Sequence, residues 1–224
     1  MRKPDNTRSM AWVMLQKFGL RGSWQILRDD VGFDLKHRIN TAASVDCEQL
    51  FLAEDIPGRN RYVASTFHVI DGTIEFAAKN FDLTQCGFVD IGAGKGKALI
   101  AASRYPFVSL RGVEYSEKLY KMATDNVKRL GLDGRVRIEQ ACASSLELES
   151  HERVLYFFNS FTGELLESML ERIATARRAE PGIFIYVNPT ETAQVSCHFR
   201  CIETQLIQPG DCEVHYFELP AGLE

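Results

Sequence analysis

The chain has 224 residues, of which 45% are hydrophobic and 25% charged, with 16 glycines and 7 prolines. This composition is typical of one globular domain and excludes collagen-like repeats, low-complexity disorder and a small disulfide scaffold. No stretch approaches the roughly 18 consecutive apolar residues of a membrane span, and the first residues lead into no secretory apolar core. We therefore expect a cytoplasmic protein.

The charge is weakly negative overall, with 26 Lys and Arg against 30 Asp and Glu, so nucleic acid is not expected as a partner. Residues 1–40 nevertheless hold eight basic and four acidic side chains, a local charge of +4 that leaves −8 for the rest. That segment is either a plain solvated surface or a docking surface for an acidic partner. The cysteines form no CxxC pair, so we expect reduced thiols and no metal site. They are Cys47, Cys86, Cys142, Cys197, Cys201 and Cys212.

Two regions are predicted, an N-terminal helical preface or lid over residues 1–60 and a main domain over residues 61–224. Apolar residues at helical spacing predict a first helix. They are Ala11, Met14, Leu15 and Phe18. Gly19 and Gly22 are expected to break this helix before a second short apolar stretch, and a further short helix is expected at residues 47–53.

The main domain alternates strands and helices. It opens with a helix over residues 66–81, capped by Thr66. Continuous apolar runs predict strands at residues 86–91, 108–115, 135–140, 154–158 and 183–187, and one-sided patterns predict helices at residues 98–102, 116–130 and 165–176. Two final strands, residues 199–207 and 212–219, should pair as an antiparallel hairpin. The fold class is therefore α/β, a doubly wound, mostly parallel seven-stranded sheet with a C-terminal hairpin.

The strongest motif is VDIGAGKG at residues 89–96, between the first strand and its helix. Glycines there permit a tight turn and let a ligand approach the backbone. A nucleotide triphosphate loop requires GxxxxGK[ST], but Gly96 is followed by Lys97 and Ala98, which supply neither the spacing nor the hydroxyl. Lys95 and Lys97 are expected to be solvated at the helix start.

Two carboxylates identify the kind of ligand. Asp90 stands two residues before the first glycine, where it would repel the pyrophosphate of a dinucleotide and suit an ammonium group. Glu114 ends the second strand, 24 residues later, where its two oxygens can accept both ribose hydroxyls. A nucleoside joined to a cationic amino acid fits both groups.

These residues resemble the class I S-adenosylmethionine (SAM)-dependent methyltransferases, over residues 66–219. The resemblance implies SAM as the cofactor, with Asp90 at its amino end and Glu114 on its ribose. The loop and strand residues implied to line it are Gly92, Ala93, Gly94, Gly96 and Tyr115. Cys142 occupies the place after the third strand where this fold commonly has an acid near the adenine, so it either borders the cofactor or is a small buried side chain.

A second, narrower resemblance is carried by FFNSF at residues 157–161. It looks like the Asn-Asn-Phe segment of the telomeric-silencing type of histone-lysine methyltransferases and the Asn-Pro-Phe of bacterial proteins similar to them, and FVDIGAGKGKALIAA at residues 88–102 fits the same group. The resemblance implies that Asn159 borders the cofactor and orients the nucleophile through its amide oxygen. It implies that Phe161 walls the pocket.

The sequence departs from this group in two places. Ser160 replaces the second Asn or Pro, and the expected Tyr-x-Pro-Thr segment appears as YVAST at residues 62–66. Tyr62 and Thr66 are still expected at the amino-acid end of the cofactor, and His68 is a candidate general base.

The predicted reaction is in-line displacement that moves a methyl group to an N or O nucleophile of a small molecule or a protein side chain. The acceptor and the oligomeric state stay open. A non-catalytic module that docks through the basic residues 1–40, and a nicotinamide oxidoreductase, are the alternatives.

Overall fold

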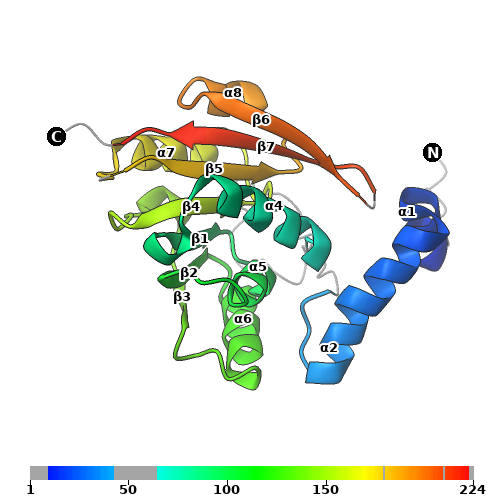
Figure 1. The fold of residues 1–224 in the computed structure, drawn as a ribbon. Helices are drawn as coiled ribbons and strands as arrows, with labels where there is room; N and C mark the ends of the chain where they lie inside the picture. The colour runs from blue at the N-terminus through cyan, green and yellow to red at the C-terminus, as the bar shows by residue number, and fades with distance from the viewer. Residues whose placement is uncertain (1–9, 43–64, 179, 209, 222–224) are drawn as a thin grey trace, which may run out of the picture.

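The computed structural model describes residues 10–42, 65–178, 180–208 and 210–221 (Figure 1). A single seven-stranded sheet has the order β3-β2-β1-β4-β5-β7-β6, with β7 antiparallel to both β5 and β6 and the other pairs parallel. The strands are β1 (Gly87–Ile91), β2 (Ser109–Glu114), β3 (Val136–Gln140), β4 (Glu152–Phe157), β5 (Gly182–Val187), β6 (Cys201–Ile207) and β7 (Cys212–Leu219). The predicted fold class and hairpin are confirmed.

Helices connect these strands, and all but the last of them are predicted by the sequence. They are α4 (Phe67–Asn80), α5 (Lys97–Ala102), α6 (Glu117–Arg129), α7 (Gly163–Thr175) and α8 (Thr192–Ser196), with short 3-10 turns η2 (Leu83–Gln85) and η3 (Ala143–Ser145). Hydroxyl caps start two of them: Thr66 accepts from the Val69 amide at 3.3 Å, and Ser116 accepts from the Leu119 amide at 3.4 Å.

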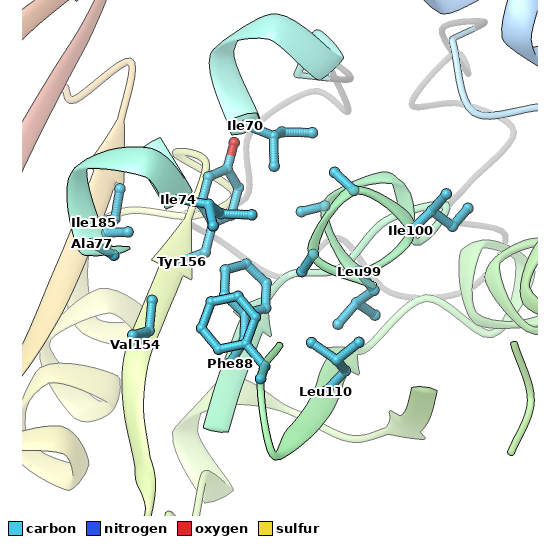
Figure 2. Close-up of a cluster of buried hydrophobic side chains, with 14 of the residues drawn as sticks. Ile70, Ile74, Ala77, Phe88, Leu99, Ile100, Leu110, Val154, Tyr156 and Ile185 are labelled. Atoms are coloured by element: carbon cyan, nitrogen blue, oxygen red, sulfur yellow. The ribbon is translucent and has the colours of Figure 1, made fainter. Parts of the chain in front are cut away.

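Both faces are covered at the centre of the sheet, where β1 and β5 are buried along their whole length, whereas the edge strands β3 and β6 are partly exposed. Alternate residues of β1 show the division, because Phe88 packs on one face and Val89 on the other. On the first face α4 and α5 cover the sheet, with Ile74 and Leu99 near Phe88 and Tyr156 (Figure 2). On the second face α7 covers it. Asp90 alternates with Val89 and so lies on the α4 and α5 side.

The N-terminal helices differ from the prediction. α1 (Met10–Ile26) is interrupted at Gly19, whose φ of 65° and ψ of −179° are not helical, but it continues through Gly22. A π-helical turn, η1 (Leu27–Val31), and α2 (Gly32–His37) follow without a break. The break at Gly22 is wrong because, in a helix already interrupted at Gly19, a second glycine costs only about 1 kcal/mol. The helix expected at residues 47–53 lies outside the described residues.

α1 extends away from the sheet (Figure 1), and its Trp24 is 66% exposed. Among the described helices, none has the length and apolar character to cross a bilayer.

Candidate cofactor-binding site

The turn after β1, residues 92–97, is called the glycine loop here. Its three glycines have a left-handed backbone conformation. Gly92, Gly94 and Gly96 have φ of 79°, 55° and 81°, values that side chains rarely allow. A Cβ on Gly92 would also meet the side chain of Ser160, with the two Cβ atoms 2.7 Å apart. The glycine loop therefore lies directly against the segment that follows β4.

Backbone and side-chain acceptors at the end of β2 hold this glycine loop. The amides of Gly92 and Ala93 donate to the Val113 carbonyl at 2.8 and 3.0 Å, and the Gly94 amide donates to Oε2 of Glu114 at 2.8 Å. The other Glu114 oxygen accepts from the Ser116 amide at 2.7 Å. Glu114 is thus buried and fixed at the strand end, as the sequence predicts for its position.

Asp90 is a buried carboxyl group beside this loop, only 4% exposed. Burial raises the pKa of Asp90 to about 8, and the nearby Glu114 adds to the rise. Within the described part of the chain no donor hydrogen-bonds to Asp90. A cationic group next to Asp90 would supply the missing partner.

The expectation of solvated lysines is wrong. Lys95 is 1% exposed and Lys97 is 5% exposed. Lys97 forms an ion pair with Asp30 of η1 and its ammonium lies 4.8 Å from the ring centroid of Phe67. Lys95 donates from Nζ to Oδ1 of Asn40 at 2.9 Å. The N-terminal segment covers this side of the loop, so both ammonium groups have protein partners there.

Asn159, at the end of β4, has its amide oxygen already engaged. Oδ1 accepts from the Tyr186 hydroxyl at 3.1 Å and from Oγ1 of Thr190 at 2.9 Å. The Tyr186 oxygen itself accepts from the amides of Thr190 and Glu191, at 3.2 and 3.3 Å, so its proton must go to an acceptor. This chain of hydrogen bonds determines that the oxygen, and not the nitrogen, of Asn159 faces Tyr186. These two donors fix the position of the oxygen, and a nucleophile that used it would share it with them.

Phe161 and Thr66 are described residues with structural partners of their own. Phe161 is 6% exposed and packs on Phe157, with ring centroids 4.8 Å apart. Thr66 caps α4, and the neighbouring Ser65 accepts from the Tyr156 hydroxyl at 2.9 Å. Phe161 therefore supports the segment after β4 from the core.

The remaining predicted residues are more scattered. Tyr115 is 40% exposed after β2, and Cys142 is half-buried, accepting from Oγ of Ser144 at 3.1 Å. Tyr62 lies outside the described residues. His68 is exposed and lines a groove of about 460 Å³ that includes no residue of the glycine loop, so its placement does not support a role as general base.

Sequence reasoning missed the polar residues that hold the loop from outside, namely Asp30, Asn40 and Asn126. A signal existed, because two lysines inside an apolar strand-turn-helix region require charged or polar partners if they are buried. The sequence alone did not say which acid or amide would meet them. Over the described residues no cluster of three metal-ligating side chains occurs, and the five described cysteines are free thiols.

No family model matches the sequence, and no curated protein matches it. Solved structures match in fold. An RNA methyltransferase from Salinibacter ruber, in complex with S-adenosyl-L-homocysteine (SAH), has a TM-score of 0.56 at 18% identity, over 72% of this chain and 97% of that chain. A SAM-dependent methyltransferase from Aquifex aeolicus has a TM-score of 0.52 at 13% identity, over 65% and 88%. The mitomycin 7-O-methyltransferase MmcR has a TM-score of 0.54 at 15% identity, over 68% and 53%.

The chain has the class I SAM-dependent methyltransferase fold. At these identities the similarity defines the fold and not the substrate, and the similar enzymes act on acceptors as different as RNA and mitomycin. The narrower resemblance to the telomeric-silencing type stays a prediction.

Proposed function

We propose that this protein binds SAM and transfers its methyl group, by in-line displacement, to a nitrogen or oxygen nucleophile of a small molecule or a protein side chain. The observation that carries the proposal is Asp90, a buried carboxyl without a donor among the described residues, next to three left-handed glycines. An ammonium group completes this site electrostatically. The similar Salinibacter ruber structure, which holds SAH, supports the same ligand class.

Different residues are proposed to contact different parts of the cofactor. Asp90 would accept from the ammonium of the methionine part. Each oxygen of Glu114 accepts from one backbone amide, and the same carboxylate would accept from the ribose hydroxyls. Tyr115 and Cys142 would border the adenine, while Tyr62 and Thr66 would border the amino-acid end.

When bound, SAM supplies a methyl carbon made electrophilic by the sulfonium. The protein then needs to hold the acceptor in line with the departing sulfur, and alignment of this kind can contribute roughly 7 to 11 kcal/mol. Asn159 is proposed to orient the acceptor from the end of β4, with Phe161 supporting it from the core. No strong general base is required for this step.

Calorimetry with SAH tests cofactor binding. The intact protein should bind, and Asp90→Ala should lose measurable affinity because it removes the partner of the ammonium. NAD serves as the control ligand, since tight binding of the dinucleotide with no binding of SAH would favour the oxidoreductase alternative. Unchanged SAH affinity in Asp90→Ala would contradict the assignment of this residue.

Radiolabelled SAM with fractions of cell extract tests methyl transfer. Label entering macromolecules identifies a protein side chain as the acceptor, and label in the small-molecule fraction identifies a metabolite. SAH binding with no label transfer to any fraction would contradict catalysis and favour a binding module that docks through residues 1–40.

A further inference from the structure

The outer side of the glycine loop is covered by residues 30–42, a segment far from the loop in sequence. Asp30 carries the first connection: it forms the buried ion pair with Lys97 and accepts from the Phe67 amide at 3.0 Å. Lys97 starts α5 and Phe67 starts α4. One carboxylate therefore ties the N-terminal segment to the two helices that begin beside the site.

Asn40 carries the second connection, in a closed set of hydrogen bonds with Lys95 and Asn126. The Asn40 amide donates to Oδ1 of Asn126 at 3.2 Å, and Nδ2 of Asn126 donates to the carbonyls of Asn40 and Lys95 at 3.2 and 3.1 Å. The Lys95 ammonium donates to Oδ1 of Asn40 at 2.9 Å, which completes the set. The backbone between Gly94 and Gly96 is thus held from α6 and from the N-terminal segment together.

The segment that presents Asn40 is held by its own hydrogen bonds to Asp34. The Asp34 carboxylate accepts from the amides of Thr41 and Ala42 and from the Thr41 hydroxyl, all at 2.7 Å. Arg38 ends α2 in a left-handed conformation with φ of 55°. Asp34 therefore keeps residues 38–42 in one shape against the loop.

We propose, on the basis of the proposed function, that residues 30–42 form part of the cofactor site. Within this segment Asp30 and Asn40 are positioning residues. They set the affinity for SAM and SAH by holding Lys97 and Lys95, and with them the glycine loop, in the shape that receives the ligand. Neither residue needs to touch the ligand.

The physical reason is the freedom of the glycines. Gly92, Gly94 and Gly96 have access to many backbone conformations, and a loop that is not held must be ordered when the ligand binds. Ordering before binding removes that cost from the binding step. Val113 and Glu114 hold the first half of the loop through its backbone, and the two buried lysines are the side chains by which its second half is held.

The test is SAH calorimetry on the full chain, well below each variant's melting temperature. Asn40→Ala removes the acceptor that Asn40 offers to Lys95, and Asn40→Asp retains one at the same place. Asn40→Ala should weaken SAH binding about twofold to thirtyfold, the range for mutations that act on a ligand through packed neighbours. Asn40→Asp should restore most of the affinity.

A second variant separates positioning from stability. Asp30→Asn combined with Lys97→Met removes both charges of the buried pair and keeps an amide oxygen that can accept from the Phe67 amide, so no buried donor loses its partner. The double variant should melt near the wild-type temperature yet bind SAH more weakly, by a similar factor. Asp71→Asn is the matched control, because Asp71 joins α4 to the end of α5 through Arg104 at 2.6 Å but contacts nothing in the glycine loop that the structure describes.

The outcomes separate the two proposals. If wild-type protein does not bind SAH, the proposed function fails. If wild-type binds SAH and the folded Asn40→Ala and double variants bind it equally well, residues 30–42 have only a structural role and the further inference is overturned. Equal weakening in Asp71→Asn would also overturn it, since the effect would not be specific to the loop anchors.

Discussion

The Glu114 carboxylate accepts from the Gly94 amide at 2.8 Å, so the residue that ends β2 shapes the loop that follows β1. Its negative charge also adds to the rise in the pKa of Asp90. The two acids at the ends of neighbouring strands therefore differ in state. Glu114 has backbone donors on both oxygens, whereas Asp90 has none among the described residues. Asp90 is the group whose charge should respond to a ligand.

Asp90→Asn should change how stability depends on pH. The pKa of Asp90 is raised from 3.8 to about 8 in the folded protein, so the folded state binds the proton more tightly than the unfolded state. The stabilisation that this proton provides is complete below about pH 4 and is lost as the pH rises toward 8. Relative to Asp90→Asn, wild-type should lose up to about 1.4 kcal/mol per pH unit over that window. Urea unfolding of both proteins at pH 5, 6, 7 and 8 measures it, and parallel profiles would contradict a raised pKa.

SAH binding should release a proton from Asp90. At pH 7 a group with a pKa of about 8 is roughly 90% protonated, and an ammonium partner favours the ionised form. We expect release of up to about 0.9 proton per SAH, seen as a dependence of the calorimetric heat on the ionisation enthalpy of the buffer. Affinity should rise from pH 6 to pH 8 for the same reason. Buffer-independent heats at pH 7 would show that Asp90 does not change its charge on binding.

The charge state of Asp90 in the structure differs from the one assumed from the sequence. The repulsion of phosphate by Asp90 assumed an ionised carboxylate, but burial on the α4 side of β1 makes ionisation depend on the ligand. The position of Asp90 at a strand end follows from local pattern, because a short apolar run and a glycine turn are both visible along the chain. Its burial depends on helices that come from elsewhere in the sequence, and a local pattern does not describe them.

The same reasoning explains which parts of the fold were predictable. The strands and the cap at Thr66 depend on neighbours within a few residues, and they are confirmed. The partners of Lys95 and Lys97 lie 55 and 67 residues away, at Asn40 and Asp30, and the sequence predicted exposure instead. The hydrogen bonds from Tyr186 and Thr190 to Asn159 likewise join segments about 30 residues apart.

Gly92→Ala should disrupt the site beyond the cost of its backbone conformation. Gly92 and Gly131 both have positive φ, 79° and 66°, so alanine at either position costs roughly 1 to 2 kcal/mol. Only at Gly92 would the new Cβ meet a neighbour, Ser160, whereas nothing lies within 4 Å at Gly131. We expect Gly92→Ala to lose SAH binding and Gly131→Ala to retain it, by calorimetry at a temperature where both are folded.

A substitution at Ser160 tests whether the loss in Gly92→Ala comes from the contact between the two segments. Because the clash is with the side chain of Ser160, Ser160→Gly should recover part of the stability and affinity lost in Gly92→Ala. The melting temperatures and SAH affinities of the two single variants and the double variant measure this coupling. Strictly additive losses would mean that the two segments do not press on each other as the structure describes.

The hydroxyl of Thr190 should affect methyl transfer through Asn159. Thr190→Val removes the donor 2.9 Å from Oδ1 of Asn159 and leaves the exposed position similar in shape, whereas Thr190→Ser keeps the donor. If Asn159 orients the acceptor, Thr190→Val should lower kcat about twofold to tenfold, the value of one hydrogen bond, with little change in SAH affinity. The rate is measured with radiolabelled SAM and the acceptor fraction that takes up label. Equal kcat values for the valine and serine variants would show that Asn159 does not depend on this hydroxyl, and a parallel loss of SAH affinity would place the effect in cofactor binding instead.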